Sequence, residues 1–168
     1  MKPLWESTRD LHHACEAHSV GNAMSKGDPP RQWYSDWLGC LSMMHHVIDK
    51  DVDQIIVRAD LVDKDINEMD VKPRFNSACK LYCDRLEKDK VLRQGAIYVL
   101  TGAHLMGGEI MRRRLVGFPV NHLQWEDRQL AINELRKFRE RPELVDQARA
   151  CFQALLDMMD EIQTKDLQ

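Results

Sequence analysis

The sequence contains no long apolar run. No stretch approaches the roughly 18 uninterrupted apolar residues that a membrane-spanning helix needs, and residues 1–6 lack the apolar core of a signal peptide. We therefore expect a cytoplasmic protein with no membrane partner.

An excess of basic charge is also absent. The chain carries 24 Lys and Arg against 27 Asp and Glu, which gives a net charge of −3. It has no long Lys/Arg block and no alternation of basic and aromatic residues, so the sequence gives no sign of a positive surface that binds the phosphates of nucleic acids. We expect partners that are small molecules or proteins, and no nucleic acid.

The cysteines do not form a recognisable set. Their number is odd, and they include neither a Cys-x-x-Cys pair nor the Cys-x-x-Cys-His motif of covalent cofactor attachment. Reduced, mostly buried thiols are the simplest interpretation for Cys15, Cys40, Cys79, Cys83 and Cys151.

No alternating pattern is long enough to build a sheet, and the chain has no internal repeat or low-complexity tract. Apolar residues instead recur at spacings of three and four, which is typical of helices with one buried face. With 168 residues the chain can bury roughly two thirds of its unfolded surface in one core. We expect one all-α domain over residues 1–168.

Helices are predicted between clusters of glycine and proline. They cover residues 8–24, 31–51, 91–115 and 123–139, and only a short helix at 52–57 is expected within residues 51–70. Another helix can start at Pro73, with its inner face formed by Phe75, Ala78, Cys79, Tyr82 and Leu86. The clearest pattern follows Pro142 and predicts the burial of Leu144, Ala148, Cys151, Phe152, Leu155, Met159 and Ile162.

A first candidate site lies near the start of the chain. Ser7 can cap a helix with Asp10 at the reciprocal position of a capping box. His12 and Glu16 then stand one turn apart on one face, as a ligand and its hydrogen-bond partner. His13 is a rival ligand, but one residue rotates a helix by about 100°, so both histidines are not expected to serve the same ion.

A second candidate site lies at residues 103–109. Gly107 and Gly108 interrupt an otherwise helical run, where each glycine costs about 1 kcal/mol relative to alanine. A kink or a close backbone approach would compensate for this cost. We expect a flat ligand, or a neighbouring helix, against this segment.

At these two segments the chain resembles the heme oxygenases. Thr8-Arg9-Asp10-Leu11-His12 is similar to the pattern around the family's proximal heme ligand. Ile97-Tyr98-Val99-Leu100-Thr101-Gly102 is similar to the stretch that leads to the distal Gly-Gly pair of bacterial biliverdin-forming members. A weaker similarity follows the last helix through Phe152. The resemblance implies a heme-oxygenase-like helical bundle.

The resemblance also implies a site and a reaction. Heme would be held by His12 on its iron, with Glu16 accepting the other ring N–H, while Gly107 and Gly108 leave room for oxygen on the distal side. Tyr98 would lie toward a propionate, although an ordinary core tyrosine fits equally well. Heme, as substrate and cofactor, would react with O2 and with electrons from a reductase or ferredoxin, giving biliverdin, carbon monoxide and ferrous iron. A biliverdin acceptor is a further expected partner.

One position departs from the family. Animal-type members carry an aspartate before the distal Gly-Gly pair, and an ungapped alignment from Tyr98 places His104 there. A histidine at this position can donate protons, ligate the iron and block oxygen, or point away from the heme. The spacing from Gly102 to Gly107 is also one residue longer than in some members.

Heme propionates need cations, and several arginines and lysines are candidates. Arg128 is favoured because it lies near the family position when counted back from Phe152. The run Arg112–Arg114 can instead dock an acidic electron donor. Solvated surfaces account for most of the others, such as Arg136, Lys137 and Arg139.

Two other functions stay open, because one fold can host different chemistries. In a non-catalytic heme-binding protein, His104 would complete a bis-histidine ligation. In a di-iron oxidase, carboxylates and histidines from several helices would converge, although the relevant helices lack a Glu-x-x-His pattern; the candidates are Glu16, His45, His46, Asp49, His104 and Glu109.

Overall fold

The computed structural model describes residues 2–167, and within these residues all regular structure is helical. The α-helices are α1 (Leu4–Ser7), α2 (Arg9–Ala17), α3 (Ser19–Lys26), α4 (Arg31–Ile48), α5 (Ala59–Glu68), α6 (Ser77–Lys88), α7 (Lys90–Gly102), α8 (Gly108–Arg114), α9 (Arg128–Arg139) and α10 (Val145–Lys165). Short helical turns lie between them: η1 (Asp49–Asp51), η2 (Gln54–Ile56), η3 (Ala103–Gly107), η4 (Asn121–Leu123) and η5 (Pro142–Leu144). The predicted all-α class is confirmed.

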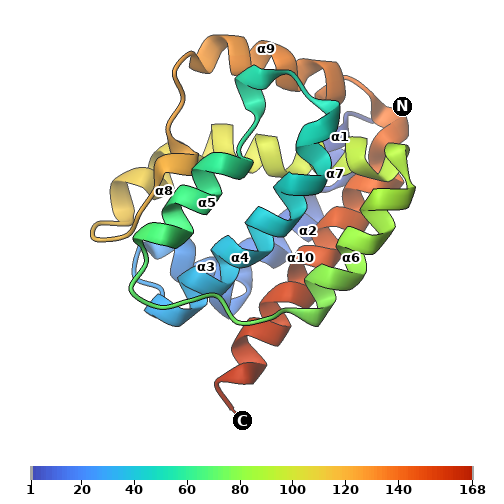
Figure 1. The fold of residues 1–168 in the computed structure, drawn as a ribbon. Coiled ribbons are helices and arrows are strands. Elements are labelled where there is room, and N and C mark those ends of the chain that lie inside the picture. Colours follow the sequence, from blue (N-terminus) through green and yellow to red (C-terminus); the bar gives the residue numbers. More distant parts are fainter. Residues whose placement is uncertain (1, 168) are drawn as a thin grey trace.

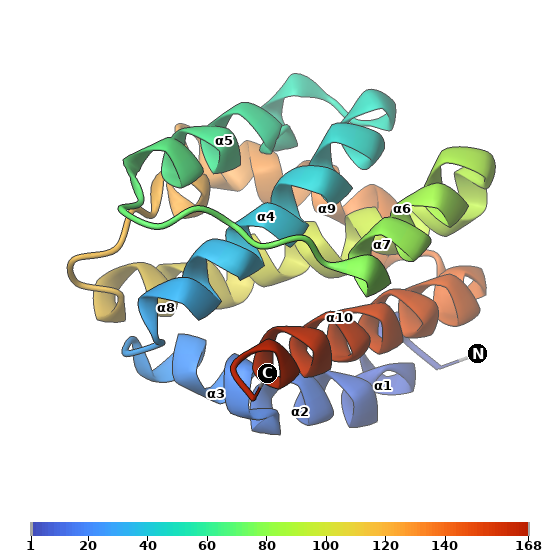
Figure 2. The same cartoon turned by 60° about the horizontal axis from the view of Figure 1, so that its bottom comes forward.

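Two helices organise the bundle. α10 packs against α7 and α6 on one side and against α2 and α3 on the other. α7 also packs against α9 (Figure 1). In the turned view of Figure 2, α1, α2 and α3 form a row beneath α10, whereas α4 and α5 lie above it. No helix within residues 2–167 is both long enough and apolar enough to cross a membrane.

The pattern of the last helix predicted its buried face correctly. All seven apolar positions named for it are buried, from Leu144 in η5 to Ile162 near the end of α10. The spacing of three and four is a direct consequence of the 3.6-residue turn, so a long helix packed along one stripe can be predicted locally. All five cysteines are buried and free, as expected.

The helix expected over residues 8–24 is broken at His18. His18 is extended (φ −60°, ψ 143°), its Nδ1 accepts the backbone N–H of Val20, and its Nε2 lies 2.7 Å from Oδ1 of Asp160 on α10. A Cβ added at Gly21 would lie 1.9 Å from the carbonyl oxygen of Cys15. A glycine at this position therefore lets α3 fold closely against α2.

The predicted capping box at the start of this helix is wrong. Ser7 ends α1, and Thr8 precedes α2 with its hydroxyl donating to the carbonyl of Leu4 at 2.9 Å. Asp10 pairs with Arg149 of α10 instead of closing a box. The carboxylate of Asp10 thus pairs with a distant helix instead of with the N-terminus of its own helix.

Three other regions differ from the prediction, and in two of them a side-chain cap sets the start of the helix. α6 begins at Ser77, where the Asn76 side chain accepts the N–H of Cys79, and Phe75 is 66% exposed rather than buried. α9 begins at Arg128, capped by Asp127. In the ambiguous stretch 51–70, the structure has η2 and the full helix α5.

The helix predicted over residues 91–115 is present as three consecutive elements, α7, η3 and α8, which together form one rod. These three elements follow one another without a loop, and η3 is a π-helical turn over Ala103–Gly107. The predicted irregularity at the Gly-Gly pair therefore takes the form of a π turn, a type of turn that is frequent at functional sites.

Candidate functional site

The first candidate site lies on the exposed face of α2. His12 and Glu16 have side chains that are 54% and 57% exposed, and His12 Nε2 lies 3.4 Å from Glu16 Oε1. The ring of Phe152 on α10 stands edge-on to His12, with 5.9 Å between ring centroids. His12 and Glu16 therefore stand one turn apart on one face of α2, as predicted, with Nε2 as the ring nitrogen beside the carboxylate.

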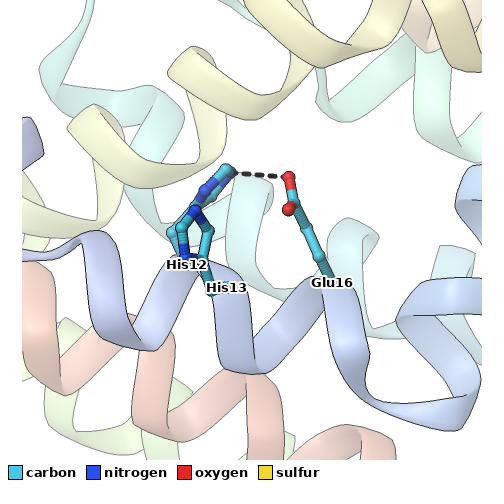
Figure 3. A group of neighbouring side chains, drawn as sticks. All are labelled: His12, His13 and Glu16. Atoms are coloured by element: carbon cyan, nitrogen blue, oxygen red, sulfur yellow. Dashed lines mark ion pairs between the residues drawn. The ribbon is translucent and has the colours of Figure 1, made fainter.

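His13 joins this pair. Figure 3 shows His12, His13 and Glu16 pointing to the same side of α2, and their ligand atoms all lie within 4.8 Å of one another. The rotation of about 100° per residue was expected to separate the two histidines. The flexible side chains converge, however, so the backbone rotation did not settle which histidine belongs to the site.

The second candidate site, η3, has one face uncovered. A Cβ added at Gly102 or at Gly107 would have no neighbouring heavy atom within 4 Å. Met106 and Ile110 are 57% and 54% exposed on the same rod. Gly108 differs, because a Cβ there would lie 3.2 Å from Cδ2 of Leu123. The Gly-Gly pair thus combines one glycine at an open surface with one at a packing contact.

The opposite side of η3 is held by α9 and the segment before it. A π turn shifts backbone carbonyls out of the α-helical pattern, and two of these carbonyls accept side-chain hydrogen bonds. The indole N–H of Trp125 donates to the carbonyl of His104 at 3.3 Å, and Arg128 Nη2 donates to that of Leu105 at 3.1 Å. These bonds stabilise the π turn from the side away from Gly107.

His104 points into the protein core. Its ring is buried, its Nε2 lies 3.0 Å from Nε2 of His45, and the ring of His122 stands edge-on with centroids 5.3 Å apart. Burial, together with the neighbouring His45, His122 and Arg58, lowers the pKa of His104 well below its ordinary value. His104 is therefore neutral at physiological pH.

Carboxylates orient the other two rings. His45 Nδ1 lies 3.0 Å from Oδ1 of Asp49, and His122 Nδ1 lies 2.5 Å from Oδ2 of the fully buried Asp65. When His45 is neutral, its Nδ1–H donates to Asp49, so its Nε2 accepts the Nε2–H of His104. The only ring N–H of neutral His104 is then used inside the core.

Burial would raise the pKa of Asp65, but hydrogen bonds from His122 and Asn121 hold it below its ordinary value. Asp65 is therefore an anion inside the core. Burial also lowers the pKa of His122, and the nearby Asp65 only partly opposes this effect. The pair is consequently a neutral imidazole that donates to a buried carboxylate.

A buried cation completes this core cluster, which we define as His45, His104, His122, Asp49, Asp65 and Arg58. The guanidinium carbon of Arg58 lies 3.7 Å from the centroid of the Trp125 ring, and its Nη1 donates to the carbonyls of His122 and Gln124. Burial lowers the pKa of Arg58 to about 10, so it stays charged near neutrality and opposes protonation of the histidines.

Sequence reasoning missed most of the core cluster. Of its histidines only His104 was assigned to the predicted site, and His45 was named only as a di-iron candidate. His45 and Asp49 are four residues apart on one helical face, the same signal that singled out His12 and Glu16. His122 and Asp65 are separated by 57 residues and carry no local signal.

The remaining predicted residues surround η3. Tyr98 on α7 is half-buried, and burial raises its pKa while Thr8 and Arg139 act in the opposite direction. Arg128 donates one guanidinium N–H to the carbonyl of Leu105 in η3. Arg112 and Arg113 both pair with Glu109, and Arg114 donates to the carbonyl of Ser25. Tyr98 and Arg128 therefore lie on the helices expected of them, α7 and α9.

The di-iron candidates do not assemble. Glu16 lies beside His12, His46 pairs with Asp63, and Glu109 pairs with arginines. Only His45, Asp49 and His104 are connected to one another.

Two surface clefts lie away from both candidate sites. One, of about 430 Å³, is lined by residues between Lys2 and Trp5 and between Arg139 and Pro142. The other, of about 660 Å³, lies between α6 and α10. Neither is lined by His12 or by a residue of η3.

Known proteins share the fold of this chain. No protein-family model and no curated protein sequence matches it. Among solved structures, it is similar to heme oxygenase-1 from Synechocystis in complex with heme, with a TM-score of 0.79 and 17% identity over 98% of this chain and 92% of that one. Heme oxygenase from Leptospira interrogans matches with a TM-score of 0.79 and 16% identity over 94% and 97% of the two chains. Heme oxygenase-2 from Synechocystis, in complex with heme and NO, matches with a TM-score of 0.79 and 15% identity over 96% of this chain and 84% of that one. At these identities the likeness establishes the heme oxygenase fold.

Proposed function

We propose that this chain, which has the fold of the heme oxygenases, binds heme through His12 and opens the ring to biliverdin, releasing carbon monoxide and ferrous iron. One observation carries the proposal: an exposed histidine with a carboxylate partner on α2 occurs together with a π turn whose Gly107 faces open space. The heme complexes of the two Synechocystis proteins support this assignment.

The residues fit a flat apolar group with an iron at its centre. His12 offers a ring nitrogen without losing a buried contact, because its side chain is exposed. Glu16 would accept the N–H of the other ring nitrogen and fix the orientation of the imidazole. Met106 in η3 and Ile110 in α8 have exposed apolar side chains. Bound heme would cover them, and they would keep water from the face of the heme that lies against η3.

Bound heme supplies an iron that activates oxygen, and electrons come from an external reductase or ferredoxin. The chain would contribute shape on the distal side. Because no side chain projects from Gly107 and nothing lies within 4 Å of its Cβ position, small molecules have room above the ring. The bent backbone of η3 would then decide which meso carbon they approach.

The buried position of His104 argues against the bis-histidine alternative. Its Nε2 bonds to His45 and its ring is enclosed by the core cluster, so ligation of a heme on the other face of η3 would require breaking these contacts. The same position argues against His104 as a direct proton donor, because its low pKa keeps it neutral.

Heme titration of the purified apoprotein, followed by reductant under air, tests the proposal. We expect a Soret band that decays into a broad biliverdin absorption at roughly 680 nm. His12→Ala should abolish the band, while His46→Ala, which removes a histidine of similar exposure (53%), should leave it unchanged. A stable band would instead identify a non-catalytic heme-binding protein. No band in the wild type, or a normal band in His12→Ala, would overturn the proposal.

A further inference from the structure

The side chains of His12, His13 and Glu16 form a cluster of metal-binding atoms. Among the residues that the structure describes, it is the one group of three or more His, Cys, Asp or Glu side chains whose ligand atoms all lie within 4.8 Å of one another. Two other histidines have one carboxylate partner each: the largely buried His18 pairs with Asp160, and the exposed His46 pairs with Asp63. The cluster on α2 therefore offers one more donor than these pairs.

The spacing of the donors fits a small cation. Two ligands that bind zinc tetrahedrally at about 2.0–2.1 Å stand about 3.4 Å apart. His12 Nε2 and Glu16 Oε1 are separated by 3.4 Å. An ion could therefore join these two atoms with little movement, and His13 lies within reach as a third ligand.

We propose that His12, His13 and Glu16 form a site for a divalent first-row transition metal ion, independent of heme. Two imidazoles and one carboxylate suit zinc, cobalt, nickel, copper or ferrous iron, whereas calcium and magnesium prefer sites made of oxygen atoms. All three side chains are exposed, so binding breaks no buried contact. The remaining coordination positions face solvent and can hold water.

The site shares His12 and Glu16 with the proposed heme site. A metal ion on His12 Nε2 and Glu16 Oε1 would occupy the carboxylate that is proposed to orient the imidazole for heme. The two ligands should therefore compete, and metal binding should raise the apparent dissociation constant of heme. This consequence rests on the proposed function, whereas the metal site itself does not.

Titration of the heme-free protein with Zn²⁺ by calorimetry, and with Co²⁺ by visible absorption, tests the site directly. We expect one ion per chain, with affinity reduced at least tenfold in His13→Ala and in Glu16→Gln. His46→Ala is the matched control and should bind as the wild type does. Absence of stoichiometric binding by the wild type, or wild-type affinity in both variants, would overturn the proposal.

A competition experiment separates this proposal from the heme proposal. At a Zn²⁺ concentration that saturates the wild type but not His13→Ala, Zn²⁺ should weaken heme binding to the wild type more than to His13→Ala, which keeps His12 and Glu16. If heme does not bind at all, the metal titration remains decisive for the metal site. If Zn²⁺ binds but leaves the heme affinity of the wild type unchanged, the shared use of His12 and Glu16 is wrong.

Discussion

Two groups of histidines in this molecule have opposite environments. On α2, His12 and His13 are exposed, and the carboxylate of Glu16 lies beside them. In the core cluster, His45, His104 and His122 are buried and bond to each other or to carboxylates. The buried group contains more histidines and more carboxylates, yet it is the exposed group whose donor atoms converge with room for a ligand.

The difference shows that proximity of histidines is a weak sign of a ligand site. A ring nitrogen serves a metal or a heme iron only if its lone pair is free. In the core cluster the nitrogens satisfy buried partners, and they hold α4, α5, η3 and η4 together. The exposed histidines contribute little to packing and are available for chemistry.

The largest expected effect comes from removing a carboxylate of the core cluster. Asp65→Ala leaves the backbone N–H of Asn121 and of His122 and the Nδ1 of His122 without their acceptor. Breaking a buried charged network in this way costs about 3–5 kcal/mol of unfolding free energy, measurable by urea denaturation. Asp60→Ala, on the exposed side of the same helix, should change it by less than about 0.5 kcal/mol. Equal losses in the two variants would show that Asp65 is not the anchor of the cluster.

Exchanging the two kinds of histidine for alanine should separate stability from binding. His104→Ala removes the partner of His45 Nε2 and should lower the unfolding free energy by about 2–3 kcal/mol. His12→Ala should leave it within about 0.5 kcal/mol. Heme titration of the folded proteins should give the reverse order, with binding kept in His104→Ala and lost in His12→Ala. Loss of binding in both would mean that the core cluster also serves the ligand.

Acidification should weaken the core cluster specifically. The pKa values of His104 and His122 are lowered in the folded protein, so below about pH 6.5 the unfolded chain binds more protons than the folded one. Stability is thus present above this pH and falls as the pH decreases, by up to about 1.4 kcal/mol per pH unit for each histidine that stays neutral. Denaturation curves between pH 7.5 and 5.5, a range of about 2 units around the histidine pKa, measure this slope.

The matched variant for the pH experiment is His104→Gln, which has no titrating group. Its unfolding free energy should vary less with pH than that of the wild type. An unchanged slope would assign the acid sensitivity to other residues.

The smallest effect on stability concerns Gly107, which ends η3, and Gly108, which begins α8. Gly107 has helical angles (φ −87°, ψ −24°) and open space at its Cβ position, so Gly107→Ala should raise the unfolding free energy by about 0.5–1 kcal/mol. Gly108→Ala should gain less, because its Cβ would lie 3.2 Å from Leu123. Thermal unfolding of both variants checks the order. A greater gain for Gly108→Ala would mean that Leu123 moves freely.

Features that depend on one helix were predictable from the sequence. The buried stripe of α10 and the one-turn spacing of His12 and Glu16 follow from 3.6 residues per turn, and the structure has both. The irregularity at Gly107 and Gly108 was also predictable, because two glycines in a helix need a structural reason.

Features that depend on distant partners were not predictable. The break at His18 needs Asp160, which lies 142 residues away, and the orientation of His104 needs His45, 59 residues away. The sequence left three roles open for His104, and its contacts in the core favour the one in which it points away from the distal face. Local spacing contains no information on such pairs.

The π turn has a further consequence for the orientation of α8, the helix that follows it. It holds one residue more than an α-helical turn, and each residue advances a helix by about 100°. Everything after η3, including Arg112–Arg114, is therefore turned by about that angle relative to an uninterrupted helix. Deleting one residue of η3, with a return to an α-helical turn, should therefore leave the phase of α8 unchanged. The π turn thus accommodates one additional residue between α7 and α8 without any loop.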